Sequence, residues 1–63
     1  MTNRIAEYRK RKGFSQKDLA DEMNVTESAI SLWESDSRKP KLDRAIELAK
    51  ILGCTIDELF EEE

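Results

Sequence analysis

The stretch from Ser15 to Ser35 constrains the fold more than any other part of the chain. Ala20 is small where two steeply crossing helices must come close, and Asn24 tolerates the positive φ that a tight turn requires. The apolar residues around them follow one inward-facing pattern that passes through a turn at Asn24: Leu19, Ala20, Met23, Val25, Ala29, Ile30 and Trp33. The stretch therefore predicts two short helices that share a buried face.

Two helices with this spacing form a helix-turn-helix, whose second helix enters the major groove of DNA. Ser15 and Thr26 are favourable N-cap residues, one before each helix, and Asp18 stands where a capping box needs an acidic group. We expect the first of these helices to end near Met23 and the second near Ser35. The motif predicts that the chain binds double-stranded DNA.

The rest of the chain also has helical patterns. A first helix is expected from Thr2 or Asn3 to Lys12, and a last one after Thr55, which can form a capping box with Glu58. Between them, the inward candidates of a helix from residue 42 to residue 52 are Leu42, Ala45, Ile46, Leu48, Ala49 and Leu52. No strand pattern occurs, so the fold class is all-α, a compact bundle of five helices.

Composition limits the other possibilities. With 63 residues, of which 38% are hydrophobic and 40% charged, the chain predicts a single domain over residues 1–63. No apolar run approaches the ~20 residues of a membrane span, and Cys54 has no second cysteine to pair with, so we expect a cytoplasmic protein without membrane contact. The chain has no His, no Gly-rich phosphate loop and no nucleophile–base pair. We therefore expect no enzyme, metal, cofactor or small-molecule ligand.

The charges are segregated along the chain. Net charge is −3, but residues 1–20 carry +4 and residues 36–44 carry +2, whereas residues 21–35 carry −4 and residues 45–63 carry −5. Two basic zones thus flank the second helix of the motif, and acid is concentrated at the end of the chain. This distribution favours a salt-sensitive DNA binder, although a merely solvated surface would also account for it.

From Arg9 to Phe60 the chain resembles the Cro/repressor-type (XRE) helix-turn-helix family of phage and bacterial regulators. The matching residues are Arg9, Gly13, Phe14, Ser15, Gln16, Leu19, Ala20, Asn24, Val25, Thr26, Ile30, Ser31, Leu32, Trp33, Glu34, Pro40, Ala49, Leu52, Gly53 and Leu59. The resemblance implies a lambda-repressor-like DNA-binding domain of five helices. It also implies a dimer on an inverted-repeat operator that represses or activates nearby genes.

The resemblance implies particular roles as well. Gln16 would donate to a DNA phosphate and brace the second helix of the motif (the reading helix), although it could instead be only a solvated residue at a helix start. Arg9 and Glu34 would form an internal ion pair. Two positions depart from the family pattern, since Asn24 and Asp36 stand where Gly is common. Both residue types tolerate left-handed backbone, so we expect the fold to be retained.

The reading helix carries unusual side chains. If Ala29, Ile30 and Trp33 face the core, four residues point outward: Glu27, Ser28, Ser31 and Leu32. None is an Arg, Lys, Asn or Gln that makes two-point contacts to a base, so we expect modest direct readout and more selectivity from DNA shape. Glu27 could equally stabilise the first helical turn, and the serines could be ordinary exposed residues.

Phosphate contacts are expected on both sides of that helix. Thr26 is both an N-cap and a phosphate candidate, and Lys17 is a weaker candidate together with Arg11 and Lys12. The loop that follows supplies four more candidates: Ser37, Arg38, Lys39 and Lys41. A solvated loop that touches no DNA is the alternative for this group.

A homodimer is expected, with Ile56 and Phe60 as candidate contact residues in the C-terminal helices. Either residue could instead only close the small core. The rival function is a protein-interaction module, such as an antitoxin, anti-repressor or adaptor, built on the same helix-turn-helix. The acidic net charge and the weakly equipped reading helix favour this rival, whereas Gln16, Thr26 and the basic loop favour DNA binding.

Overall fold

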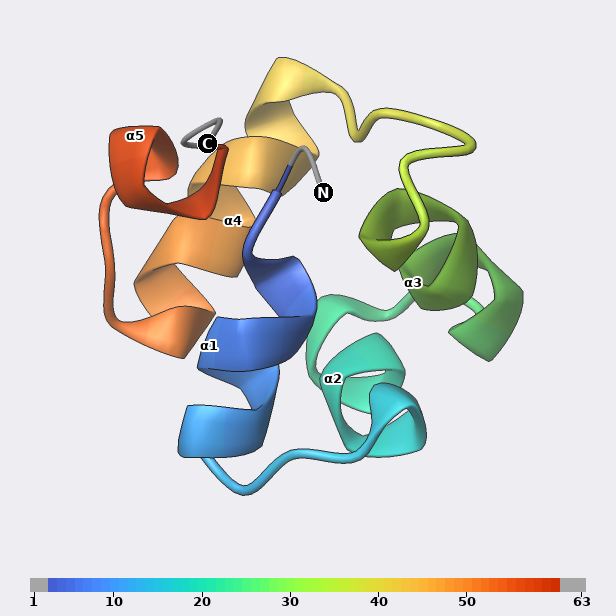
Figure 1. Cartoon of the computed structure of the whole chain (residues 1–63). Coiled ribbons are helices and arrows are strands. Elements are labelled where there is room, and N and C mark those ends of the chain that lie inside the picture. The colour runs from blue at the N-terminus through green and yellow to red at the C-terminus, as the bar shows by residue number, and fades with distance from the viewer. Residues whose placement is uncertain (1–2, 61–63) are drawn as a thin grey trace.

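The computed structural model describes residues 3–60, which form five α-helices and no strand within that range (Figure 1). The helices are α1 (Ile5–Arg11), α2 (Gln16–Met23), α3 (Glu27–Glu34), α4 (Leu42–Leu52) and α5 (Ile56–Leu59). In Figure 1, α2 and α3 lie together on one side of the molecule, and α4 and α5 lie on the other. The predicted all-α class is confirmed.

The caps that the sequence predicts define the helix starts. Ser15 and Thr55 each form a complete capping box, with Asp18 and Glu58 respectively. The hydroxyl of Thr26 accepts a hydrogen bond from the Ala29 amide at 3.2 Å. Because an N-cap satisfies amides that have no partner inside the helix, these side chains determine where α2, α3 and α5 begin.

The start of α1 differs from the prediction. Thr2 lies outside the described residues, and Asn3 is not helical, since α1 begins at Ile5. The Asn3 side chain instead accepts a hydrogen bond from the Ile5 amide at 3.2 Å and donates one to the Trp33 carbonyl at 2.9 Å. A contact 30 residues away in the chain therefore holds Asn3 outside the helix.

Two turns depend on left-handed backbone at residues other than glycine. Asn24 has φ 57° between α2 and α3, and Asp36 has φ 62° after α3. Behind Asp36 the chain folds back on α3, because the amides of Ser37 and Arg38 both donate to the Leu32 carbonyl, at 3.0 and 3.2 Å. The expectation that Asn24 and Asp36 would accept these conformations is confirmed.

All five helices contribute to the core. Its fully or almost fully buried side chains are Ile5, Leu19, Ala20, Met23, Ile30, Trp33, Ala45, Leu48, Ala49, Leu52 and Leu59. The predicted buried face of α4 is wrong at two positions, because Leu42 is 71% exposed and Ile46 is 39% exposed. Leu42 is the first residue of α4, next to the loop and ahead of the turns that cross the core, and Ile46 lies at the edge of the buried face.

None of the described helices is long and apolar enough to cross a membrane.

Candidate DNA-binding surface

The α2–α3 unit presents a polar face to solvent. Glu27, Ser28 and Ser31 are exposed on α3, while Ile30 and Trp33 on its opposite face are buried in the core. Leu32, the fourth predicted reading residue, is half-buried, so only part of its side chain is accessible. The outward orientation expected for these positions agrees with their burial, and their contacts to bases remain a prediction.

Thr26 can serve two purposes at the start of α3. Its hydroxyl oxygen accepts from the Ala29 amide, which leaves the hydroxyl hydrogen free to donate. The residue is exposed, so this hydrogen can reach a group outside the protein, such as a phosphate oxygen. The capping role is observed, and the phosphate contact is compatible with it.

A nearly buried network fixes the other end of α3. Arg9 Nε donates to Glu34 Oε2 at 2.5 Å, and the two side chains are only 11% and 10% exposed. Gln16 Nε2 donates to Glu34 Oε1 at 2.9 Å, and Arg9 Nη1 donates to the Phe14 carbonyl at 2.8 Å. The expected Arg9–Glu34 ion pair is confirmed, and Gln16 joins α2 to the same carboxylate. One amide hydrogen of Gln16 remains for a partner outside the protein.

The capping box at the start of α2 lowers the pKa of its acidic residue. Hydrogen bonds to Asp18, first from the Ser15 amide and then from the Ser15 hydroxyl, keep the pKa of this carboxyl below its ordinary value. Lys17 beside it is exposed, and its ammonium lies 3.4 Å from Asp21 Oδ2 one turn further on. Both side chains are largely solvated, so this pair is weak and leaves Lys17 available for a phosphate.

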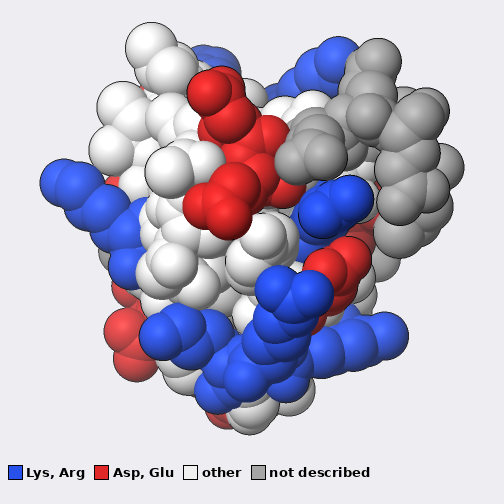
Figure 2. Space-filling view, turned by 60° about the vertical axis from the view of Figure 1, so that its left-hand side comes forward, with Lys and Arg blue, Asp and Glu red and all other residues white. Residues whose placement is uncertain are grey.

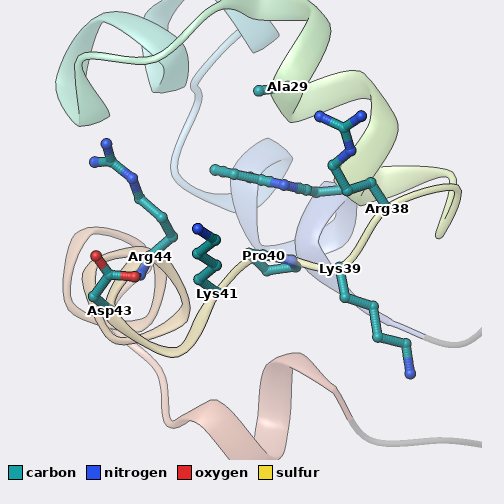
Figure 3. Close-up of a pocket in the computed structure, with 8 residues that line it drawn as sticks. Ala29, Arg38, Lys39, Pro40, Lys41, Asp43 and Arg44 are labelled. Carbon is teal, nitrogen blue, oxygen red and sulfur yellow. The ribbon is translucent and has the colours of Figure 1, made fainter.

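The loop after α3 and the start of α4 enclose an open hollow of about 380 Å³ beside the reading helix. Its lining residues are Ala29, Trp33, Arg38, Lys39, Pro40, Lys41, Asp43 and Arg44. In Figure 3, the Arg38 side chain points to the same side as Ala29, Lys41 lies across the hollow from Arg38, and the Lys39 side chain extends away from both. Arg38, Lys39 and Lys41 thus line one hollow, but their charged ends point in different directions.

Ser37 and Arg44 lie near opposite ends of α3. Ser37 Oγ is exposed and lies 3.0 Å from Ser35 Oγ, in the turn that carries the basic loop. Arg44, which sequence reasoning counted only within a basic zone, reaches back from α4 to the α2–α3 turn, where its Nη1 donates to the Met23 carbonyl at 3.2 Å. The same nitrogen lies 3.1 Å from Glu47 Oε1, so part of its charge is balanced. Only the packing of α4 against α2 could reveal this position.

The side of the molecule formed by α1 and α5 is divided by charge. Figure 2 shows acidic side chains gathered near the top of this view and most of the basic ones lower down, with further charges of both signs towards its edges. The acid of α5 comes from Asp57 and Glu58, and the last turn of α1 contributes the exposed Lys10 and Arg11. α5 therefore carries part of the negative charge, while Asp21, Glu22 and Glu27 place further acid on α2 and α3.

Comparison with known proteins decides the family. The model of the HTH_3 helix-turn-helix family matches residues 5–59, which include all five helices. The chain belongs to the XRE-type helix-turn-helix family. The resemblance identified from the sequence is thereby confirmed, and the matched region contains every proposed DNA-contact residue of this helix-turn-helix protein.

Relatives of this XRE-type chain are named as regulators. It is 36% identical over 59 residues to the HTH-type transcriptional regulator PuuR of Escherichia coli (strain K12), which covers 94% of this chain and 32% of PuuR. It is 34% identical over 61 residues to the HTH-type transcriptional regulator AnsR of Bacillus subtilis (strain 168), covering 97% of this chain and 53% of AnsR. An uncharacterized HTH-type transcriptional regulator of Archaeoglobus fulgidus is 32% identical over 60 residues, covering 95% of this chain and 86% of that protein. The chain thus spans about a third of PuuR and about half of AnsR.

Proposed function

We propose that residues 1–63 form one DNA-binding domain of a transcriptional regulator, with α3 in the major groove. The observation that carries this proposal is the exposed polar face of α3, with phosphate-binding candidates near both ends of the helix. Thr26 caps the start of α3, Gln16 binds Glu34 at its end, and Arg38 and Lys41 line the hollow beside it. Lys17, next to Gln16, and Ser37, in the turn after α3, are exposed. Family membership supports the same function, which takes place in the cytoplasm and needs no catalysis, metal or cofactor.

Recognition by this surface depends more on phosphates than on bases. Glu27 can accept from a cytosine amino group, Ser28 and Ser31 can bond several bases, and Leu32 can touch a thymine methyl. Each good two-point contact would add about 1–3 kcal/mol of discrimination, and α3 offers none of the side chains that make one. Arg38, Lys41 and the exposed Lys39 supply charge for the backbone, so affinity should fall steeply with salt.

We further propose a symmetric dimer that represses transcription from an inverted-repeat operator. An apolar groove of about 350 Å³ lies beside the basic loop, lined by Lys39, Pro40, Leu42, Ala45, Ile56 and Phe60. Ile56 and Phe60 are half-buried, so each closes the core in part and keeps some surface for a second copy. To bind two half-sites on one face of DNA, such a dimer would hold its two α3 helices about 34 Å apart, one helical turn of the duplex.

The test is selection of bound duplexes from a random pool at about 100 mM salt, where phosphate contacts alone bind weakly. The wild type should enrich an inverted repeat. Ser31→Glu should abolish the enrichment, because it places a carboxylate against the groove. Lys50→Gln, which makes the same change in net charge at the exposed far end of α4, should enrich the same site as the wild type.

The alternative is a protein-interaction module built on the same fold. Two observations support it: α3 carries no side chain that makes two-point contacts to a base, and the net charge of the chain is −3. A pool in which no sequence is enriched, with binding that disappears as salt rises, would favour this alternative over sequence-specific regulation.

A further inference from the structure

Asn3 is a buried polar residue that joins distant parts of the chain. It is 4% exposed, and both ends of its amide have partners. Nδ2 donates to the Trp33 carbonyl at 2.9 Å, while Oδ1 accepts from the Ile5 amide at 3.2 Å. Asn can make both bonds because its side chain carries a donor and an acceptor, whereas an aspartate carries acceptors only.

The partner of Asn3 lies at the end of the reading helix. Trp33 is in the last turn of α3, its ring is buried in the core, and its carbonyl also accepts from the Asp36 amide at 3.2 Å. The segment that carries Asn3 is itself held by α5, since the Arg4 amide donates to the Leu59 carbonyl at 2.7 Å. The first described residues therefore connect the end of α3 to the end of α5.

We propose that Asn3 is a positioning residue for DNA recognition, which fixes the direction of α3 through the Trp33 carbonyl. This inference rests on the proposed function. Hydrogen bonds from Ser28 and Ser31 to bases tolerate only small changes in distance, because these side chains are short and belong to a rigid helix. The long side chains of Arg38 and Lys41 can follow a displaced phosphate. Loss of the Asn3 bond should therefore reduce sequence discrimination more than general DNA affinity.

The test variant is Asn3→Asp, which keeps the shape and the acceptor for Ile5 but removes the donor to Trp33. The matched control is Ile5→Val, which perturbs the same segment and the same core but leaves both Asn3 bonds in place. At a temperature where circular dichroism shows every variant folded, Kd is measured for the selected site and for a scrambled duplex. We expect Asn3→Asp to lose about tenfold in affinity for the selected site and less than about twofold for the scrambled duplex. Ile5→Val should keep the wild-type ratio.

If Asn3→Asp does not fold, Asn3→Ser replaces it, because serine is too short to reach the Trp33 carbonyl and adds no charge. Amide hydrogen exchange supplies a readout that needs no DNA. The amides of Asp36 and Ser37 should exchange faster in the variant, and that of Val25, at the other end of α3, should be unchanged.

The outcomes separate this inference from the function on which it rests. A wild type that selects no DNA overturns both, and the exchange data then show whether Asn3 still holds α3. A wild type that selects a site which the folded Asn3 variant binds with the same discrimination overturns this inference alone. Equal losses of discrimination in Ile5→Val and the Asn3 variant would assign the effect to the core rather than to the Asn3 bond.

Discussion

The α2–α3 half and the α4–α5 half of the molecule both expose one face, but the two faces differ in chemistry. On α3 the exposed residues are polar. The position of α3 is fixed by the nearly buried Arg9–Glu34 ion pair and by the hydrogen bond from Asn3 to the Trp33 carbonyl. On α4 the exposed residues include Ile46 and also Leu42, which lines an apolar groove. The first face suits the polar edges and phosphates of DNA, and the second suits another protein surface. We therefore propose that the two faces bind different kinds of partner.

The largest effect is expected at the network behind α3. Glu34→Ala should lower the free energy of unfolding by about 3 kcal/mol, because it leaves the nearly buried Arg9 without its carboxylate. Urea denaturation measures the loss. Glu7→Ala is the matched control, since Glu7 pairs with Arg11 on the surface, where such a pair contributes only about 0–1 kcal/mol. Equal losses in the two variants would show that the network does not anchor α3.

A charge placed on the apolar face of α4 should weaken dimerisation and leave the stability of the monomer almost unchanged. Leu42→Asp should weaken the dimer by about 2 kcal/mol, because it places a charge in the centre of the proposed interface. Leu42 is 71% exposed, so the stability of the monomer should change little. Sedimentation equilibrium over a range of protein concentrations measures the first effect, and urea denaturation of the dilute protein measures the second. A dimer unaffected by Leu42→Asp would place the interface elsewhere.

The basic end of the polar face should show a smaller, sequence-independent effect. Arg38→Ala should weaken binding to all duplexes by about 1 kcal/mol and lower the salt slope by about 1, as expected for one lost phosphate contact. Fluorescence anisotropy at several salt concentrations gives both quantities. Lys50→Ala removes an exposed cation from the last turn of α4 and should leave the slope unchanged. If the two variants behave alike, the loop makes no contact of its own.

The smallest effect is expected at two capping carboxylates, one in the α2–α3 half and one in the α4–α5 half. Hydrogen bonds from Ser15 lower the pKa of Asp18, and hydrogen bonds from Thr55 lower that of Glu58. Since both pKa values are lower in the folded protein, their stabilisation is present above the ordinary values of 3.8 and 4.5 and is lost as pH falls through the folded ones. Thermal melts between pH 6 and about pH 2 should therefore show a smaller acid-induced decrease for Asp18→Asn and Glu58→Gln than for the wild type. A decrease of wild-type size in both variants would mean that other groups control acid unfolding.

Features that depend on near neighbours in the chain were predicted well. The capping boxes at Ser15 and Thr55, the cap at Thr26 and the left-handed turn at Asn24 each involve residues within a few positions of one another. Their geometry is set by local hydrogen bonds and by backbone sterics, which the sequence states directly. The span of α4 was predicted for the same reason, from helical periodicity that ends at a glycine.

Errors arose where periodicity was used to infer burial. The pattern of α4 assigns Leu42 and Ile46 to the core, but a helical period gives only the direction of a side chain and not what lies opposite it. Leu42 does not pack in the core because it lies at an open groove, opposite Ile56 and Phe60. In the candidate site, Arg44 was missed because its contact with the α2–α3 turn requires α4 to pack beside α2.

The sequence by itself determined the five helices, the family, and the polar outward face of α3, because each follows from local caps, spacing and periodicity. Tertiary structure alone decided that Gln16 shares Glu34 with Arg9, that Asn3 holds the end of α3, and that Lys39 turns away from Arg38 and Lys41. These contacts join residues from different helices and loops. Their distances are set only when the core packs and brings those segments together.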